Sequence, residues 1–357
     1  MENPIWHNIH PQFKLNGIPY SLEDLKEVGY SLVKEGESFE NSIGSFLLDW
    51  ASDSSTLEVF TSGSTGKPKK IILQKEHMVN SALATGAYFD LKPAQTALLC
   101  LPSSGIAGKM MLVRAMVLGL HLEYVEPSST PLQNSDNAYD FVAMVPLQVQ
   151  NSLDKLGRIK TLIIGGAPVD TKLRSALKEY ATNCYETYGM TETITHIAVK
   201  RITQDPTNCF ETLPHISISV DGRSCLIIDA PKISDDKIVT NDVVELVSEN
   251  QFKWLGRYDT IINSGGIKLI PEEIEKKLAD IIHSRFFVAG LPDATLGQKL
   301  VLVVEESQVD IQKLLNKIKS LKGIQKYEVP KEVHALKPFI ETKSGKIHRK
   351  KIVQQIR

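Results

Sequence analysis

The chain has 357 residues, which is enough for two or more domains with sizeable cores. Its hydrophobic content of 42% and charged content of 23% are typical of an ordinary soluble globular protein. No run of 18 apolar residues occurs, so we expect no membrane span, and the first residues lack the basic and apolar regions of a signal peptide.

The charge is unevenly distributed along the chain. The net charge is −1, yet residues 311–357 hold 13 Lys/Arg against 3 Asp/Glu, which leaves −11 for the remainder. Such a basic segment indicates a nucleic acid or a phosphorylated small molecule as partner. Its aromatic residues are Tyr327 and Phe339, too few for a base-stacking platform. We therefore favour nucleotide phosphates and expect no nucleic acid.

The four cysteines are far apart and show no C-x-x-C spacing: Cys100, Cys184, Cys209 and Cys225. This pattern fits reduced residues of a cytoplasmic protein and needs neither a disulfide nor zinc. The sequence leaves the oligomeric state open, a homodimer included.

The first 55 residues predict an irregular start with one polar helix around 22–35. From residue 57 to 197, apolar strand-like runs then alternate with helical stretches. The runs are 96–101, 122–125, 141–145, 161–164 and 183–187, and the helices are 75–88, 107–118, 147–156 and 170–180. This alternation predicts an α/β fold with a parallel sheet covered by helices.

Short strands separated by turn residues follow from 195 to 254 and predict antiparallel ribbons or a partial barrel. Residues 1–256 would form the large N-terminal α/β domain, which ends at 257–259, and residues 260–357 would form a small C-terminal α+β domain. The predicted elements of this small domain are helices at 271–278, 311–321 and 346–356 and strands at 286–289, 300–305 and 332–336.

A stretch rich in glycine, hydroxyls and lysine, Thr61-Ser-Gly-Ser-Thr-Gly-Lys-Pro-Lys-Lys70, lies between two strand-like runs. Successive backbone N–H groups in such a turn form an anion-binding concavity, and the hydroxyls and lysines add donors and charge. A polyphosphate is the expected ligand. The spacing is not that of a Walker loop, and the alternative is a plain polar hairpin.

Two further stretches follow predicted strands, where ligands bind in open α/β sheets. In the first, Gly165, Gly166 and Ala167 would let a flat base approach the backbone. The second is Tyr185-Glu-Thr-Tyr-Gly-Met-Thr-Glu192, in which Tyr188 would stack on adenine beside Gly189, Thr191 would donate to a phosphate and Glu192 would hold Mg²⁺. The alternative for both is an ordinary turn.

Five motifs, in this order, resemble those of the acyl-adenylate-forming superfamily, the AMP-forming acyl- and aryl-CoA synthetases. They are the Thr61–Lys70 loop, Tyr188-Gly-Met-Thr-Glu192, Thr240-Asn-Asp242, Gly256 to Glu275, and Thr342-Lys-Ser-Gly-Lys-Ile-His-Arg349. The resemblance covers the chain beyond roughly its first fifty residues. Relatives usually carry a longer segment before the loop, so the chain resembles a shortened form.

The resemblance implies the remaining roles. The nucleotide phosphates would lie on Thr61, Ser62, Gly63, Ser64, Thr65, Gly66 and Lys67, with Asp242 and Arg257 on the ribose. Asp259 would be the hinge, Gly265 and Gly266 would line the path of the CoA thiol, and Lys346 would be the catalytic lysine. ATP, Mg²⁺ and CoA are therefore expected.

The acid substrate is indicated by the helix at 107–118. Where many relatives have His this chain has Gly105, and the largely apolar helix carries Lys109 and Arg114, which cannot share a face. Buried cations need partners, and a second substrate carboxylate would satisfy Lys109; the alternative is a structural ion pair. This helix and residues 191–201, with Thr195 and His196, resemble shortened o-succinylbenzoate–CoA ligases of menaquinone biosynthesis, whose substrate carries two carboxylates.

We therefore predict an ATP-dependent acid–CoA ligase that forms an acyl-adenylate and then a thioester. The open alternatives are another aryl- or acyl-CoA ligase, a homologue that binds nucleotide without turnover, and a nucleic-acid binder.

Overall fold

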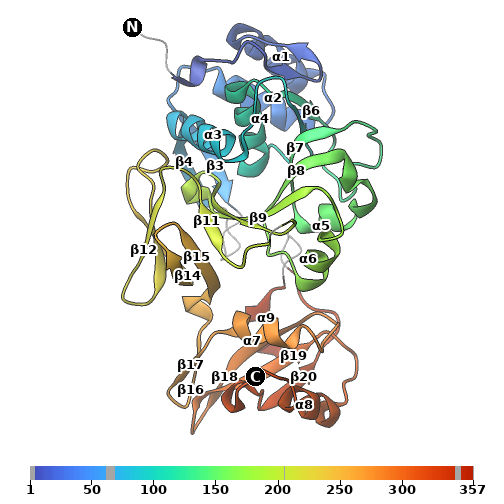
Figure 1. The fold of residues 1–357 in the computed structure, drawn as a ribbon, viewed down its shortest axis with the longest axis vertical. Helices are drawn as coiled ribbons and strands as arrows, with labels where there is room; N and C mark the ends of the chain where they lie inside the picture. The colour runs from blue at the N-terminus through green and yellow to red at the C-terminus, as the bar shows by residue number, and fades with distance from the viewer. Residues whose placement is uncertain (1–4, 62–68, 205, 342–346, 357) are drawn as a thin grey trace. The chain divides into compact units, whose positions relative to one another are not determined.

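The structure is a computed structural model that describes residues 5–61, 69–204, 206–341 and 347–356 (Figure 1). The chain forms two compact units. The first contains residues 1–219, 227–238 and 246–252, and the second contains residues 220–226, 239–245 and 253–357.

The centre of the first unit is a set of parallel strands in the spatial order β9-β8-β7-β5-β6. Their bounds are β5 (Thr96–Leu99), β6 (His121–Tyr124), β7 (Tyr139–Met144), β8 (Ile159–Ile164) and β9 (Asn183–Gly189). Helices α3 (Lys75–Phe89), α4 (Ile106–Leu118), α5 (Pro146–Gln150) and α6 (Thr171–Leu177) lie between them in sequence. The predicted α/β class is confirmed.

Alternate residues along these strands face opposite layers of helices. Leu98, Val142 and Leu162 belong to one apolar core together with Val149 of α5 and Leu173 and Leu177 of α6. Helices α3 and α4 pack against each other, and Phe89 at the end of α3 contacts Phe141, the neighbour of Val142 (5.7 Å between ring centroids). The strands are thus buried on both faces, as their nearly continuous apolar sequences require.

The N-terminal part contains more structure than the sequence predicted. The polar helix is present as α1 (Leu22–Lys34), but a second helix, α2 (Glu40–Trp50), follows it, and the short strands β1 (Lys14–Leu15) and β2 (Ile18–Pro19) precede it. A Cβ on Gly44 would lie 2.5 Å from the carbonyl oxygen of Gly29, so α1 and α2 cross where both have only glycine. The hairpin that flanks the predicted phosphate loop is β3 (Thr56–Thr61) and β4 (Lys69–Gln74).

Antiparallel strands continue the main sheet beyond β9, as predicted for residues 195–254. They are β10 (His196–Arg201), β11 (Phe210–Thr212), β12 (Ser217–Val220), β13 (Cys225–Asp229), β14 (Ile238–Ser248) and β15 (Gln251–Arg257). Among the described residues, the order of this 13-stranded mixed sheet is β12-β13-β14-β15-β11-β10-β9-β8-β7-β5-β6-β1-β2.

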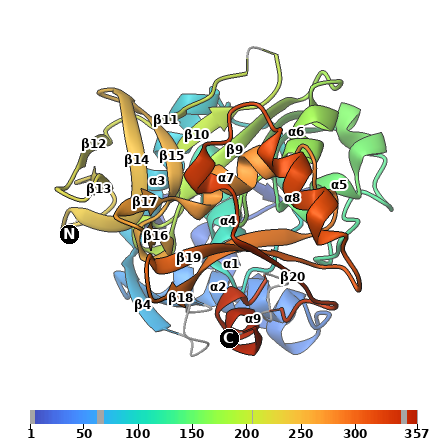
Figure 2. The same ribbon diagram turned by 90° about the horizontal axis from the view of Figure 1, so that it is seen from below.

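The second unit has its own five-stranded sheet and its own apolar core. Its strands are β16 (Ile262–Ser264), β17 (Ile267–Leu269), β18 (Phe286–Asp293), β19 (Gly297–Val304) and β20 (Glu332–Ala335), and its helices are α7 (Pro271–Leu278), α8 (Ile311–Lys319) and α9 (Arg349–Gln355). Figure 2 shows strands β16 to β20 and helices α7 to α9 as a ribbon. Ile274 and Leu278 of α7 and Ile318 of α8 pack on Leu300 and Leu302 of β19.

None of the helices in the described part of the chain combines the length and the apolar character that a membrane crossing requires.

Candidate active site

A cavity of about 230 Å³ lies where the parallel strands of the first unit end. It is lined by Leu101 after β5, by Ala143 and Met144 of β7, by Ile163 of β8 and by Thr187 of β9. The start and middle of α4, together with residues 189–191, 195 and 196, form a further part of the wall. This is the edge at which open α/β sheets bind their ligands.

Six residues predicted from the sequence meet in this cavity. They are Gly165, Gly166, Gly189, Thr191, Thr195 and His196. A Cβ at Gly189 would lie only 2.2 Å from the carbonyl oxygen of Thr195, so glycine is required for the chain to fold back there. Gly166 has φ +80°, a conformation that favours glycine. The predicted turns therefore share one cavity because their glycines allow close backbone approach.

A buried cation, Arg114 of α4, lines the same cavity and is 1% exposed. Its guanidinium makes long contacts with neutral groups, at 3.3 Å to Thr195 Oγ1 and 3.4 Å to both Thr85 Oγ1 and His196 Nδ1. No carboxylate of the described residues forms an ion pair with it. Burial lowers the pKa of Arg114 to about 9, which leaves the group charged at neutral pH.

His196 is buried beside this guanidinium and is neutral. Burial, together with the nearby Arg114 charge, holds the pKa of His196 well below its usual range. If Arg114 donates to Nδ1, the ring proton belongs on Nε2, which is buried and has no hydrogen-bond partner among the described residues. The wall of the cavity thus carries the positive charge of Arg114 and a His196 nitrogen that has no hydrogen-bond partner among the described residues.

Other predicted residues of the first unit lie around this cavity without lining it. The Lys109 ammonium lies 5.1 Å from the ring centroid of Phe46 on α2, and burial lowers its pKa. Gly105 is the N-cap residue of α4 and Ala167 is exposed in the loop after β8. Tyr188 packs against the rings of Phe210 and Phe252, at 5.8 and 5.2 Å.

Glu186, two residues before Tyr188, holds several elements together. Its buried carboxylate accepts hydrogen bonds from the Val169 N–H (3.1 Å) and from Arg174, and it forms an ion pair with Lys200 (2.8 Å). Burial alone would raise the pKa of Glu186, but Lys200 and Arg174 hold it below its usual value. Glu186 therefore anchors the loop that begins with Gly165 and Gly166.

The predicted ribose residues belong to the second unit. Asp242 of β14 is buried, and Arg257 at the end of β15 lies 3.8 Å from its Oδ1. The Arg257 Nε also donates to Asp259 (3.0 Å), and this contact lowers the pKa of the Asp259 carboxyl. Gly265 and Gly266 form the turn between β16 and β17, with φ +58° and +82°.

Two predicted parts of the site lie outside the described residues. They are the loop residues Ser62, Gly63, Ser64, Thr65, Gly66 and Lys67, and the lysine at position 346. The backbone of Thr61 is described as the last residue of β3.

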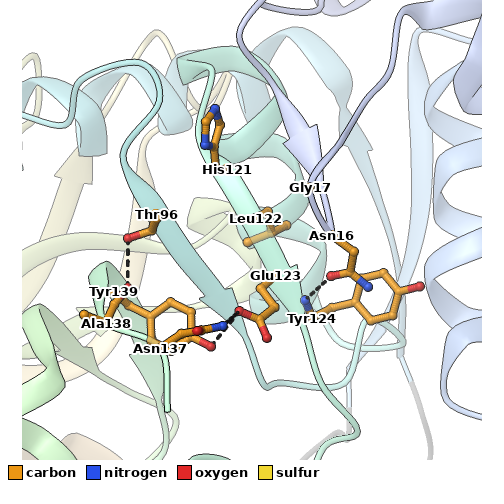
Figure 3. Close-up of a pocket in the computed structure, with 10 residues that line it drawn as sticks. All are labelled: Asn16, Gly17, Thr96, His121, Leu122, Glu123, Tyr124, Asn137, Ala138 and Tyr139. Carbon is orange, nitrogen blue, oxygen red and sulfur yellow. Dashed lines mark hydrogen bonds between the residues drawn. The ribbon is translucent and has the colours of Figure 1, made fainter. Parts of the chain in front are cut away.

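A different hollow, of about 520 Å³, lies at the opposite ends of the strands (Figure 3). Thr96, His121 and Tyr139, which line it, are the first residues of β5, β6 and β7. Its polar groups bond to one another: Glu123 accepts from Asn137 and from the Tyr139 hydroxyl, at 2.9 and 2.8 Å. Because it contains none of the predicted site residues, we assign it no role.

Comparison with known proteins decides the family. A family model described as "AMP-binding enzyme" matches residues 48–236. The chain belongs to this family. The match begins in α2 and extends through every first-unit motif described above.

Relatives with assigned activities are similar over most of the chain. The 2-succinylbenzoate–CoA ligase of Listeria monocytogenes is 25% identical over 372 residues, covering 95% of this chain and 75% of that one. The enzyme of the same name from Bacillus cytotoxicus is 24% identical, covering 83% and 69%. The chain is thus shorter than these ligases.

Solved structures agree with the fold. An acyl-CoA synthetase (AMP-forming)/AMP-acid ligase II-like protein from Dyadobacter fermentans is 35% identical, with a TM-score of 0.63 and coverage of 93% of this chain and 98% of that one. The o-succinylbenzoate CoA synthetase of Bacillus subtilis, in complex with its acyl-adenylate, has a TM-score of 0.71 at 19% identity, covering 92% and 80%. The predicted superfamily and enzyme class, an AMP-forming acid–CoA ligase, are confirmed.

Sequence reasoning missed that Arg114 faces the cavity. Both cations of α4 were visible in the sequence, and so was the angle between them, but the pattern did not say which one meets the ligand. Thr187 and Met190, which also line the cavity, had no distinguishing signal beyond their motif.

Proposed function

We propose that the protein is an o-succinylbenzoate–CoA ligase that converts o-succinylbenzoate, ATP and CoA into o-succinylbenzoyl-CoA, AMP and diphosphate. The observation that carries this proposal is the Arg114 guanidinium, which is buried in the cavity without an ion-pair partner among the described carboxylates. Buried charges are normally paired, so the ligand should supply the anion. A substrate with a second carboxylate supplies it while the first one reacts.

The names of the relatives support the same substrate. Two of them act on 2-succinylbenzoate according to their names, and they resemble this chain over 83–95% of its length. Arg114 takes the place that the sequence suggested for Lys109, because Arg114 and not Lys109 lines the cavity.

The reaction proceeds in two steps. A carboxylate oxygen attacks the α-phosphorus of ATP, the bond to the β-phosphate oxygen breaks, and diphosphate leaves with its electrons. The CoA sulfur then attacks the acyl carbon, its proton passes to solvent, and AMP leaves. Neither step needs a protein nucleophile, so positioning and charge stabilisation carry the chemistry.

Apart from Lys109, the predicted residues keep their roles in this scheme. The Thr61–Lys67 loop would hold the phosphates, Gly165, Gly166, Ala167, Tyr188 and Gly189 the base, and Asp242 and Arg257 the ribose. Lys346 would bridge the carboxylate and the α-phosphate, Thr191 would donate to a phosphate, and Gly265 and Gly266 would face the thiol. Gly105, Thr195 and His196 would complete the acid site.

The residues fit a magnesium ion that is held mainly by substrate. Glu192 is an exposed carboxylate directly after Thr191 of the cavity wall. No cluster of three or more potential metal ligands occurs in the described part of the chain. Magnesium usually takes one or two protein carboxylates together with substrate phosphates. Glu192 would supply the carboxylate, and the ion would neutralise phosphate charge.

The test is diphosphate release from ATP in the presence of a panel of acids. We expect release with o-succinylbenzoate and little with benzoate, which lacks the second carboxylate, or with fatty acids. Preferred turnover of a monocarboxylic acid would instead identify another aryl- or acyl-CoA ligase. ATP binding without release for any acid would identify a nucleotide-binding homologue.

A further inference from the structure

Asp242, the proposed ribose residue, is held by a tryptophan from the neighbouring strand. The indole Nε1–H of Trp254 donates to Oδ1 of Asp242 over 3.1 Å. Trp254 lies on β15, which is adjacent to β14 in the sheet. The hydroxyl of Thr240 also accepts from the Asp242 backbone N–H (3.0 Å), so both the main chain and the side chain of Asp242 are fixed.

This contact restricts the orientation of the carboxylate. Asp242 is 7% exposed, and both the Trp254 indole and the Arg257 guanidinium approach Oδ1, at 3.1 and 3.8 Å. An indole N–H is a donor only, so the carboxylate must remain an acceptor in this contact.

A vicinal diol makes strict demands on a carboxylate. To accept from both the 2′- and the 3′-hydroxyl, its two oxygens must face the ribose together, which a freely rotating Asp side chain does only part of the time. A group held in the productive orientation before binding avoids that ordering cost. At metal sites, hydrogen-bond donors that contact a ligating carboxylate likewise hold it in the orientation that binds the ligand.

We infer that Trp254 is a positioning residue, which orients Asp242 toward the ribose and so makes the protein discriminate between ribonucleotides and deoxyribonucleotides. The inference rests on the proposed function, which assigns Asp242 to the ribose. The inference predicts that loss of the Trp254 donor weakens the binding of AMP more than that of 2′-deoxy-AMP, because a site built to bond a hydroxyl rejects the analogue that lacks it. A tryptophan that only filled space would affect both nucleotides alike.

The experiment is calorimetric titration of the full-length protein with AMP and with 2′-deoxy-AMP. Trp254→Phe removes the N–H donor and keeps an aromatic ring. We expect AMP to bind about three- to tenfold more weakly, since the cost is that of ordering one side chain, and 2′-deoxy-AMP, which offers Asp242 only its 3′-hydroxyl, to be weakened less. Trp6→Phe is the matched control, because the indole N–H of Trp6 is buried without a hydrogen-bond partner in the described structure.

The outcomes separate this inference from the ribose assignment. Equal weakening of both nucleotides in Trp254→Phe, or no weakening, overturns the positioning role. Asp242→Ala, which removes the acceptor oxygens, should abolish the preference for AMP; if the preference survives that change, the ribose assignment itself is wrong. Trp254→Tyr, which also lacks the indole donor, provides the same comparison if the Phe variant does not fold.

Discussion

Arg114 and Lys109 are five residues apart on α4 and offer a direct test of how the acid is recognised. Arg114→Met should raise the KM for o-succinylbenzoate roughly ten- to a hundredfold, since the loss of a hydrogen bond to a charged group costs about 1.5–3 kcal/mol. The KM for ATP should change little. Lys109→Met is the matched control and should leave both constants near their original values.

The same substitution should not destabilise the protein. A buried cation without an ion-pair partner lowers stability, so its replacement by an apolar side chain of similar length is expected to be neutral or stabilising. Thermal unfolding of Arg114→Met checks this. A large loss of stability together with an unchanged KM would make Arg114 a structural residue and remove the main support for a dicarboxylate substrate.

Glu186 should make stability depend on pH. The pKa of its carboxyl is lower in the folded protein than its usual 4.5, so its stabilising contribution is present above that value and is lost as the pH falls through the lower, folded value. At pH 7, Glu186→Gln should lower the free energy of unfolding by about 2–3 kcal/mol, less than a fully buried pair because Arg174 and Lys200 are partly exposed.

Denaturant unfolding of wild type and Glu186→Gln at several pH values measures this difference. The two curves should converge at acid pH, where the wild-type carboxyl is protonated. A constant difference across the whole range would show that Glu186 contributes through packing and not through its charge.

At the scale of elements, an ion pair helps to position the start of helix α9, whose Ile352 is also buried in an apolar cluster with Phe287. Arg349, its first residue, donates to both carboxylate oxygens of Glu275 on α7, at 2.8 and 2.9 Å, and its guanidinium lies 5.5 Å from the Phe287 ring centroid. Arg349 is three residues beyond Lys346 in sequence. Anything that shifts the start of α9 should therefore displace the proposed catalytic lysine.

Arg349→Lys keeps the charge but cannot form the paired contact. We expect adenylate formation to slow about ten- to a hundredfold, since small misplacements of a reacting group are costly. Conversion of supplied o-succinylbenzoyl-AMP to the thioester should be nearly normal. An equal decrease in both half-reactions would indicate damage to the whole second unit and not to the position of Lys346.

Many of the helices and strands were predictable because strongly periodic apolar segments fit only one type of secondary structure. Helix α3 was expected at 75–88 and occupies Lys75–Phe89, and β8 was expected at 161–164 and occupies Ile159–Ile164. Helix α2 was missed although Ile43, Phe46, Leu47 and Trp50 follow a helical period. Gly44 and the polar residues around it weaken the local signal, and only the close crossing with α1 explains a glycine there.

The sequence predicted the motifs of the site, but it did not predict how their residues are arranged in space. The glycine turns at Gly165 and Gly189 were recognisable in the sequence, whereas the cation that faces the acid and the indole behind Asp242 depend on tertiary contacts. Local sequence carries no information about which side of a buried helix meets a cavity or which strand lies beside another.

At the scale of the whole molecule, we propose that residues 260–357 serve the two half-reactions in turn, by movement about Asp259. Lys346→Ala should then slow acid-dependent diphosphate release about 10²–10³-fold, as expected for the loss of one preorganised donor. It should still convert supplied o-succinylbenzoyl-AMP and CoA to the thioester. Gly266→Leu should do the reverse. Equal damage to both steps by Lys346→Ala would indicate a single static site.

The most direct test of the central proposal is mass spectrometry of the reaction products. The protein is incubated with Mg·ATP and o-succinylbenzoate, and CoA is added afterwards. We predict that o-succinylbenzoyl-AMP accumulates on the enzyme before CoA is added and is replaced by o-succinylbenzoyl-CoA and AMP after it. Absence of the adenylate and of the thioester, from a folded protein that binds ATP, would contradict the proposed function.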